Sequence, residues 1–450
     1  MAGGVWLSEN KVRPGAYINF RQVAKPLLTV GDRGIATVAL PLSWGPSDVL
    51  IDVESSELLN GDSRAKLGFT AADTADSLVA RLILSNCYRC LFYRLDSGGV
   101  QASGTISGFA VTAKYPGKAG NKITVQINKN KVDTTKYKFL TFWDGLLVHS
   151  QEVKSKDEVQ SNDYIDVTTD SGQLKEAAGV TLTSGSDGTV NASTAYPAYF
   201  ALLEVAKWQT MAIITDGSTI NALAKTFIEN QREDEGRGVQ LCIYDDASTY
   251  NYEGVIASEQ SLVFANETVP KEIVPAWVAG ITAGAQINQS NTYKVVEGAI
   301  GFAPEHKDSV IKEKLKLGKF LFSTRQDGNI VVEKDINTYH LFEPEKGYVF
   351  SKNRAIRVMD EMRMSIRSVW ENNYIGKVTN NNRGRAIFKA DVVAYITELQ
   401  RLETVEASYD PVENTIVERG VNVDAVRANV NRLPILDAME ILYMDIEVLA

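Results

Sequence analysis

Cysteine is scarce in this chain, and its scarcity excludes a framework of disulfide bonds. Among 450 residues there are three cysteines: Cys87, Cys90 and Cys242. Cys87 and Cys90 form a Cys-x-x-Cys pair, a spacing found in redox centres and in half of a zinc site. The redox motif opens a helix after a strand, whereas this pair follows an expected helix and enters an apolar strand-like run. We therefore predict buried thiols in a reducing compartment.

Histidine and the usual nucleotide-binding loops are lacking as well. His149, His306 and His340 lie far apart in the sequence, so none completes a zinc site with the cysteine pair. The turn at residues 185–188 (GSDG) lacks the Lys-Ser or Lys-Thr that would reach a phosphate, and no GxGxxG or GxSxG motif occurs. The sequence therefore gives little support to catalysis, and we expect no cofactor and no metal.

Long apolar runs are absent too. No run approaches the roughly 20 residues of a membrane span, and residues 1–10 lack the basic start and apolar core of a signal peptide. The predicted location is the cytoplasm, without insertion into a membrane. An excess of positive charge is also missing, because 47 basic and 56 acidic residues give a net charge of -9. This balance argues against nucleic acid as the main partner.

The chain does contain enough apolar residues, 44%, for several cores, and its length suits roughly three domains. One stretch is rich in Gly, Thr, Ser and Lys and has short alternating runs, which predicts a small β-sandwich inserted between two α/β parts. The predicted fold class is therefore a multidomain α/β and α+β protein. Its predicted parts are residues 1–25 (N-terminal arm), 26–99 (α/β part), 100–186 (inserted β-sandwich), 187–348 (central α/β domain), 349–432 (C-terminal inner domain of helices and strands) and 433–450 (C-terminal arm).

Individual elements follow from the spacing of apolar residues. Helices are expected at residues 56–67, 73–84, 198–208, 218–230, 274–285, 353–371 and 386–402. Strands are expected at residues 34–40, 87–95, 211–215, 238–244, 261–265, 319–324, 330–332, 415–418, 421–430 and 439–448. The last helix has a single packing stripe, made by Phe388, Val392, Tyr395, Leu399 and Leu402.

Two aspartates follow predicted strands, at the place where α/β proteins keep ligand-binding loops. Asp216 comes directly after MAIIT, and Asp245, itself followed by Asp246, comes directly after GVQLCIY. In one interpretation these carboxylates serve a metal- or nucleotide-dependent enzyme. In the other they cap the following helices, because Asp is favoured at helix starts.

The predicted helix at residues 353–371 carries a basic side. Its arginines are Arg354, Arg357, Arg363 and Arg367. Asp360-Glu361 on the same helix has the pattern of a surface charge run rather than of a buried acid and base. The basic side suits a polyanion or an acidic protein surface, and the alternative is a solvated face with ion pairs within the helix.

Both ends of the chain show the alternation of strands. Residues 439–448 (MEILYMDIEV) follow Pro434, which favours an extended backbone before it. One side of this strand would carry Leu442, Met444, Ile446 and Val448. Residues 16–20 (AYINF) are a similar piece near the N-terminus. A terminal strand can complete its own sheet or add to the sheet of a neighbour, and both possibilities remain open.

Four segments resemble a known family: RPGAYINF (residues 13–20), PLSWGP (41–46), SGSDG (184–188) and ILYMDIEV (441–448). Together with the order of the predicted parts, they resemble the tail sheath proteins of contractile phage tails and phage-tail-like particles, of the kind found in Gram-positive phages and defective prophages. The resemblance implies a structural protein without an active site. Its subunits would stack as hexameric rings in a helical array around an inner tube, and contract to drive the tube through the target cell envelope.

The resemblance also implies the partners and the location. The partners would be further copies of the chain, the inner tail tube protein, and the baseplate and tail terminator proteins, with no nucleic acid. The location would be the sheath of a virion or of a tail-like particle such as a bacteriocin, assembled in the cytoplasm of the bacterial host. The inserted β-sandwich is then expected on the outer surface.

Strands exchanged between subunits are a further implication of the resemblance. The donors would be residues 15–22 and 440–448, with Ala16, Tyr17, Ile18, Phe20, Leu442, Tyr443, Met444, Ile446 and Val448. The acceptors would be residues 415–418 and 421–430, with Thr415, Ile416, Val417, Val421, Val423 and Val426. The residues in contact with the inner tube would be Arg354, Arg357, Arg363 and Arg367. An enzyme built on Asp216 and Asp245, and a scaffold or adhesin carrying a β-sandwich, are the alternatives.

Overall fold

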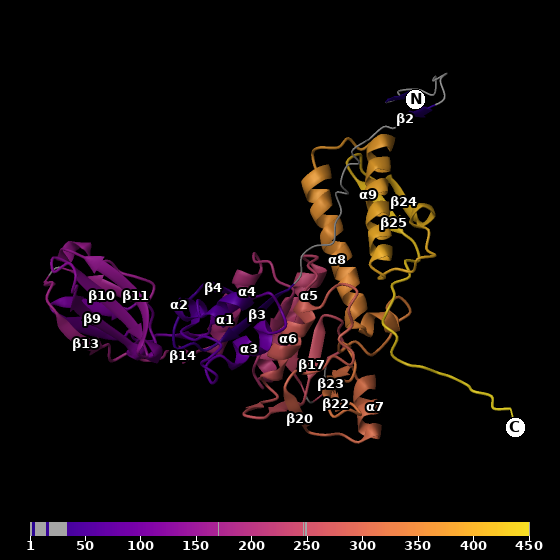
Figure 1. Ribbon diagram of the computed structural model, residues 1–450. Coiled ribbons are helices and arrows are strands. Elements are labelled where there is room, and N and C mark those ends of the chain that lie inside the picture. Colours follow the sequence, from indigo (N-terminus) through magenta and orange to yellow (C-terminus); the bar gives the residue numbers. More distant parts are fainter. Residues whose placement is uncertain are drawn as a thin grey trace. The chain divides into compact units, whose positions relative to one another are not determined.

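The computed structural model describes residues 2–4, 15–17, 34–169, 171–245, 247 and 250–449 (Figure 1). The chain divides into two compact units. The smaller consists of Met1–Val30 and Ser365–Pro434, and the larger of Gly31–Met364 and Ile435–Ala450. Helix α8 (Asn353–Val369) begins in the larger unit and ends in the smaller.

A seven-stranded sheet forms the centre of the larger unit, with the strand order β21-β17-β16-β15-β3-β5-β4. Its neighbouring strands are parallel, except that β4 runs antiparallel to β5. The sheet is therefore mostly parallel, as is typical of α/β proteins. Its strands are β3 (Ile35–Leu40), β4 (Leu50–Glu54), β5 (Arg89–Arg94), β15 (Thr210–Ala212), β16 (Gln240–Tyr244), β17 (Val255–Ser258) and β21 (Lys319–Phe320).

Helices cover both faces of this sheet, which is why its strands read as nearly continuous apolar runs. Val38 and Phe92 point into a core shared with α1, α2, α3 and α6. Ala39 and Tyr93 point the other way, into a core shared with α4 and α5. The helices are α1 (Ser55–Asn60), α2 (Ser63–Leu67), α3 (Leu78–Leu84), α4 (Ala192–Leu203), α5 (Ser218–Glu233) and α6 (Val274–Gly284).

Three helix predictions in this unit need correction. The helix predicted at residues 198–208 is α4, which begins at Ala192 and ends at Leu203. The single helix predicted at residues 56–67 is two helices, because Gly61 adopts a left-handed backbone (φ 95°) that ends α1. The next helix starts at Leu78 rather than at Asp73. The Asp73 carboxylate instead accepts a hydrogen bond from the N–H of Thr70, which holds a turn before the helix.

The rest of the larger unit's central part consists of small sheets and one short helix. A three-stranded sheet has the order β19-β18-β20, and the strands predicted at residues 319–324 and 330–332 contribute an antiparallel pair, β22 and β23. These elements are β18 (Ser261–Phe264), β19 (Thr268–Val269), β20 (Ala299–Ala303), α7 (Asp308–Lys316), β22 (Phe322–Thr324) and β23 (Ile330–Val332).

The inserted β-sandwich is also present in the larger unit (Figure 1). A four-stranded sheet, β11-β10-β9-β13, and a three-stranded sheet, β12-β8-β7, enclose a core that includes Phe109 and Phe139. The chain enters through β6 (Asp96–Ser97) and leaves through β14 (Thr189–Val190), and these two strands pair with each other. The sandwich strands are β7 (Ser103–Ile106), β8 (Phe109–Ala113), β9 (Ile123–Lys129), β10 (Tyr137–Trp143), β11 (Leu146–Val153), β12 (Ile165–Thr168) and β13 (Ala177–Thr181).

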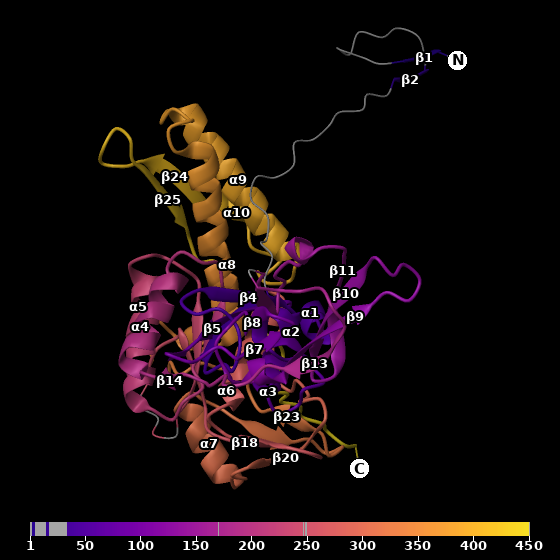
Figure 2. The same ribbon diagram turned by 90° about the vertical axis from the view of Figure 1, so that its left-hand side faces the viewer.

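Helix α9 (Asn382–Arg401) is the main element of the smaller unit, and it lies beside the hairpin of β24 (Thr415–Arg419) and β25 (Val426–Val430) in both ribbon views (Figure 2). Its predicted stripe is buried at Phe388, Val392, Tyr395 and Leu399. The Asn381 side chain caps its start by accepting from the N–H of Gly384. The unit also contains a π-helical segment (Trp370–Tyr374), α10 (Pro411–Asn414) and the parallel pair β1 (Ala2–Gly4) and β2 (Gly15–Tyr17).

Candidate intersubunit surfaces

The hairpin of β24 and β25 is a sheet of only two strands. It is antiparallel, with Thr415 opposite Val430 and Val417 opposite Ala428. Within the described part of the chain, no third strand pairs with either outer edge. An edge strand presents unpaired N–H and C=O groups, which are a template for another strand.

The turn of this hairpin differs from the prediction. The second strand begins at Val426, not at residue 421, because residues 420–425 form the connection between the strands. The N–H of Gly420 donates to the carbonyl of Ala425, and the N–H of Ala425 donates to the carbonyl of Asn422. Val421 and Val423 are therefore turn residues, 101% and 74% exposed.

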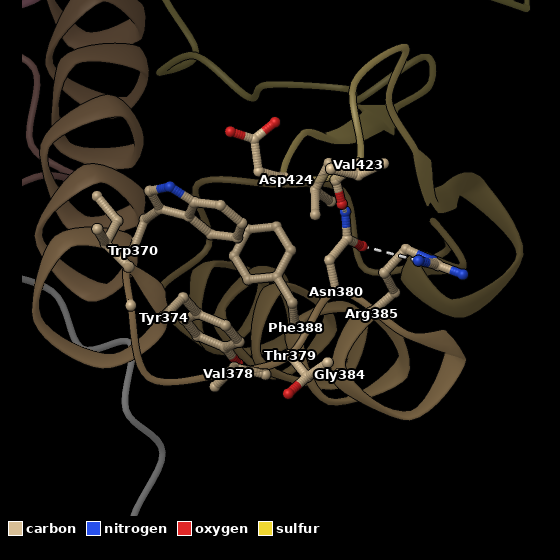
Figure 3. Close-up of a pocket in the computed structure, with 13 residues that line it drawn as sticks. Trp370, Tyr374, Val378, Thr379, Asn380, Gly384, Arg385, Phe388, Val423 and Asp424 are labelled. Carbon is tan, nitrogen blue, oxygen red and sulfur yellow. Dashed lines mark hydrogen bonds between the residues drawn. The ribbon is translucent and has the colours of Figure 1, made fainter.

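A cavity of about 470 Å³ lies beside the hairpin (Figure 3). Trp370 and Tyr374 line it as stacked rings with centroids 5.4 Å apart, and Phe388 meets both edge-on. Val423 and Val426 line it from the hairpin side. The sequence did not predict this aromatic wall, since two aromatics four residues apart on a helix are equally typical of an ordinary core.

The C-terminal arm is extended and apolar, and it belongs to no strand of the described chain. Seven of its side chains are between 66% and 100% exposed: Ile441, Leu442, Tyr443, Met444, Ile446, Val448 and Leu449. Consecutive exposed apolar residues of this kind mark an interaction site. The predicted strand at residues 439–448 thus has no partner strand among the described residues of its own chain.

The N-terminal donor prediction falls only partly on described residues. Ala16 and Tyr17 lie in β2, whose backbone pairs in parallel with β1. Ile18 and Phe20 lie outside the described residues.

The four arginines of α8 do not share one exposed side. Arg357 is fully buried and pairs with Asp335 at 3.0 Å, and Arg354 is 6% exposed. Arg363 and Arg367 are exposed, although Arg363 also donates to the carbonyl of Arg232 at 2.9 Å. The expected four-residue basic side is therefore reduced to Arg363 and Arg367.

Asp360 and Glu361 on α8 also differ from the surface run that the sequence predicted, because both are buried. Asp360 pairs with Arg232 at 2.7 Å, and both side chains are at most 5% exposed. In a buried ion pair each charge is compensated by the other, whereas either charge alone would be costly to remove from water. The spacing of charges on a helix does not show which of them has a partner on another element.

The two candidate enzyme aspartates do not form a site. The Asp245 carboxylate pairs with Lys319 Nζ at 2.7 Å and accepts a hydrogen bond from the N–H of Ala247, which makes a local turn. The capping interpretation is wrong for Asp245, because the next helix of the described chain, α6, begins only at Val274. A buried ammonium at this carboxylate disfavours a metal cation. Asp216 is exposed, and Asp246 lies outside the described residues. Among the described residues, no group of three or more His, Cys, Asp or Glu residues is placed to hold a metal ion.

The three cysteines are buried free thiols, as predicted. Burial raises the pKa of Cys87 to about 12 and raises the pKa of Cys90 and Cys242 well above the usual range. A thiol with so high a pKa has almost no reactive thiolate at neutral pH. In the ranges that the structure covers, no helix combines the length and the apolar character of a membrane span.

Comparison with known proteins identifies the family. Three family models match: the phage tail sheath protein beta-sandwich domain at residues 97–187, the phage tail sheath protein central domain at residues 189–338, and the phage tail sheath C-terminal domain at residues 345–449. The sheath tail protein from Desulfitobacterium hafniense is 31% identical, with a TM-score of 0.79 over 94% of this chain and 99% of that chain. The chain belongs to the phage tail sheath proteins.

Other relatives of this sheath protein come from phage-like elements. The protein XkdK of the Bacillus subtilis phage-like element PBSX is 30% identical over 481 aligned positions, which span 100% of both chains. The helical sheath of the anti-feeding prophage in its contracted state shares the fold, with a TM-score of 0.56 and 10% identity over 97% of this chain and 99% of that chain. The predicted fold class is confirmed as a multidomain α/β sheath fold with a β-sandwich and a C-terminal domain. Tail sheath proteins are structural proteins, so the enzyme alternative is not supported.

Proposed function

We propose that this sheath protein polymerises as stacked hexameric rings around an inner tube, and that neighbouring copies are joined by exchanged strands. One observation carries the proposal. The apolar C-terminal arm is exposed along residues 441–449, while the hairpin of β24 and β25 has unpaired outer edges. Strand addition would supply main-chain hydrogen bonds at the edge and bury alternate side chains of the arm.

Burial of the arm provides the driving force. Each Leu, Ile or Met side chain that moves from water into an apolar site gains about 1.5–3 kcal/mol. Leu442, Met444 and Ile446 share one side of the extended arm, and Tyr443 lies on the other. A shift of one residue in the pairing would exchange these two sides. The apolar cavity lined by Trp370 and Phe388 lies next to the hairpin that would receive the arm.

Membership of the family supports the proposal of contraction and of the remaining partners. A structural relative with the same fold forms a helical sheath in a contracted state, and another belongs to a baseplate. The sheath would pass between two packings of the same subunits while the exchanged strands keep neighbours connected. The further partners would be an inner tube, a baseplate and a tail terminator, in a particle assembled in the host cytoplasm. In such an array the β-sandwich would lie on the outer surface.

Deletion of residues 441–450 tests the strand exchange. The truncated protein should keep the helix content and melting temperature of the full chain, because residues 441–449 belong to no strand of the described chain. It should fail to form tubular polymers in negative-stain electron microscopy. A matched control lacks only residues 449–450 and should still polymerise. Tubes from the larger truncation, equal in number and length to those of the full chain, would contradict the proposal.

A further inference from the structure

The larger unit holds the first part of the C-terminal arm through a cluster of charges. Lys352 Nζ forms ion pairs with the Asp437 carboxylate at 3.1 Å and with the Glu440 carboxylate. Glu440 also accepts a hydrogen bond from Thr292 Oγ1 at 2.7 Å, and its second oxygen lies 3.7 Å from Lys334 Nζ. Side chains from three separate segments thus converge on one carboxylate of the arm.

Lys352 has a fixed position in this cluster. It lies between the 3-10 helix Tyr348–Ser351 and α8, and its N–H donates to the carbonyl of Val349. Its side chain is only 2% exposed. Burial by itself would lower the pKa of Lys352, but the hydrogen bond that Lys352 donates to Glu440 and the charge of Asp437 raise that pKa above its usual value. The ammonium is therefore charged, and a buried charge needs a partner.

The two carboxylates come from a short piece of chain. Asp437 and Glu440 are three residues apart, which corresponds to about 10 Å in a fully extended backbone. Because both reach the same nitrogen atom, the segment between them must curve around Lys352. Ala438 and Met439, which lie within this curve, are exposed.

Within the described chain, the hydrogen bonds and ion pairs of the arm end at Glu440. The Glu440 side chain is 13% exposed, whereas Ile441 is 67% and Leu442 is 81% exposed. We propose that Lys352, Asp437 and Glu440 form a clasp that fixes where the C-terminal arm leaves its own subunit. Only residues 441–449 are then available to a second copy of this chain. This last statement rests on the strand exchange proposed above.

The clasp limits how far the arm reaches. Nine residues, 441–449, span at most about 30 Å when fully extended. If the clasp opened, the loose segment would begin at Leu436, after the bridge residue Ile435, and the fourteen residues to Leu449 would span about 45–50 Å. A shorter, directed segment has a higher effective concentration at one acceptor and excludes more distant ones. The clasp therefore selects which neighbouring copy receives the arm. The donor strand, expected to begin at Glu440, would then begin at Ile441, because the clasp holds Glu440.

Spin-label mobility in the unassembled protein tests the clasp directly. Labels are attached through Met439→Cys, inside the clasp, or through Met444→Cys, beyond it, and the three native thiols are buried. In the otherwise unchanged chain the label at 439 should be slower than the label at 444. Lys352→Met keeps the length of the buried side chain and removes its charge. It should therefore increase the rotational mobility of the label at 439 about threefold and leave the mobility of the label at 444 unchanged.

Two further variants keep this test decisive. Glu440→Gln changes a residue of the arm rather than one of the folded core. It should therefore increase the mobility of the label at 439 even if Lys352→Met prevents folding. Lys312→Met removes an exposed lysine that pairs with Asp308 in α7, and should change neither label. Equal mobility at 439 and 444 in the unchanged chain, or no response to both clasp variants, would overturn the clasp.

A polymerisation assay then distinguishes the clasp proposal from the strand-exchange proposal. With the clasp opened by Glu440→Gln, we expect several-fold fewer regular tubes and more irregular aggregates, because arms would reach the wrong neighbours. Regular tubes in undiminished number from this variant would overturn the selecting role of the clasp. Failure of the unchanged chain to use residues 441–449 in polymers would instead count against the proposed strand exchange, whatever the labels show.

Discussion

Trp44 lies edge-on to Trp143, with ring centroids 5.0 Å apart and ring planes at 87°. Trp44 belongs to the PLSWGP segment after β3, and Trp143 ends β10 of the β-sandwich. Trp44 is fully buried in the core of the sandwich, although its position in sequence is far from the insertion. Its Nε1–H donates to the carbonyl of Ala65 at 2.9 Å. A segment singled out only by resemblance to sheath proteins therefore connects the sandwich to the α/β part at residues 26–99.

Trp44→Ala should destabilise the junction between the sandwich and the α/β part at residues 26–99. Loss of a buried Trp in a tight core costs about 3–5 kcal/mol. Thermal unfolding followed by tryptophan fluorescence should show the sandwich melting earlier than in the unchanged chain. Trp44→Phe keeps an aromatic ring and should cost clearly less. An unchanged melting profile for Trp44→Ala would show that the ring does not hold the junction.

Asp360→Ala should destabilise the larger unit strongly. The change leaves Arg232 buried without its carboxylate partner, which costs about 3–5 kcal/mol. Asp308→Ala is the matched control, because its pair with Lys312 is exposed and worth at most about 0.5 kcal/mol. Urea unfolding of both variants measures the difference. Equal midpoints for the two variants would contradict the buried pair.

Charge reversal at Arg363 and Arg367 tests the expected contact with an inner tube. Arg367 pairs with Glu371 on the surface of the helix, so its loss should cost the fold only about 0.3–0.5 kcal/mol. The double change Arg363→Glu, Arg367→Glu should weaken assembly on a purified tube more than assembly of the sheath alone, measured by co-sedimentation. Arg401→Glu on α9 is an exposed control. An equal loss of assembly in both assays would contradict the proposed contact with the tube.

The three thiols should resist modification in the folded protein. Because burial raises the pKa of Cys87 to about 12, the thiol is protonated at pH 8 and little thiolate is present to react. A thiol reagent at pH 8 should label none of the three cysteines before urea is added, and all three after unfolding. Rapid labelling of Cys87 and Cys90 in the native protein would revive the redox interpretation of the Cys-x-x-Cys pair.

Much of the architecture could be predicted from local pattern. The continuous apolar runs of β3 and β16 predicted buried strands, and the stripe of Phe388 and Leu399 predicted the buried face of α9. Element boundaries were less certain, because they depend on single contacts. Gly61 divides one predicted helix by its left-handed backbone, and the turn at residues 420–425 removes Val421 and Val423 from a predicted strand.

The sequence by itself determined the classes of element, the absence of a disulfide framework and the apolar alternation of the C-terminal arm. These depend on the spacing of neighbouring residues. Only the tertiary structure decided which charges are buried, because each depends on a partner far away in the chain. Arg357 meets Asp335 across 22 residues, and Lys352 meets Glu440 across 88. No local spacing encodes such a pair, since it forms only when the fold removes both charges from water.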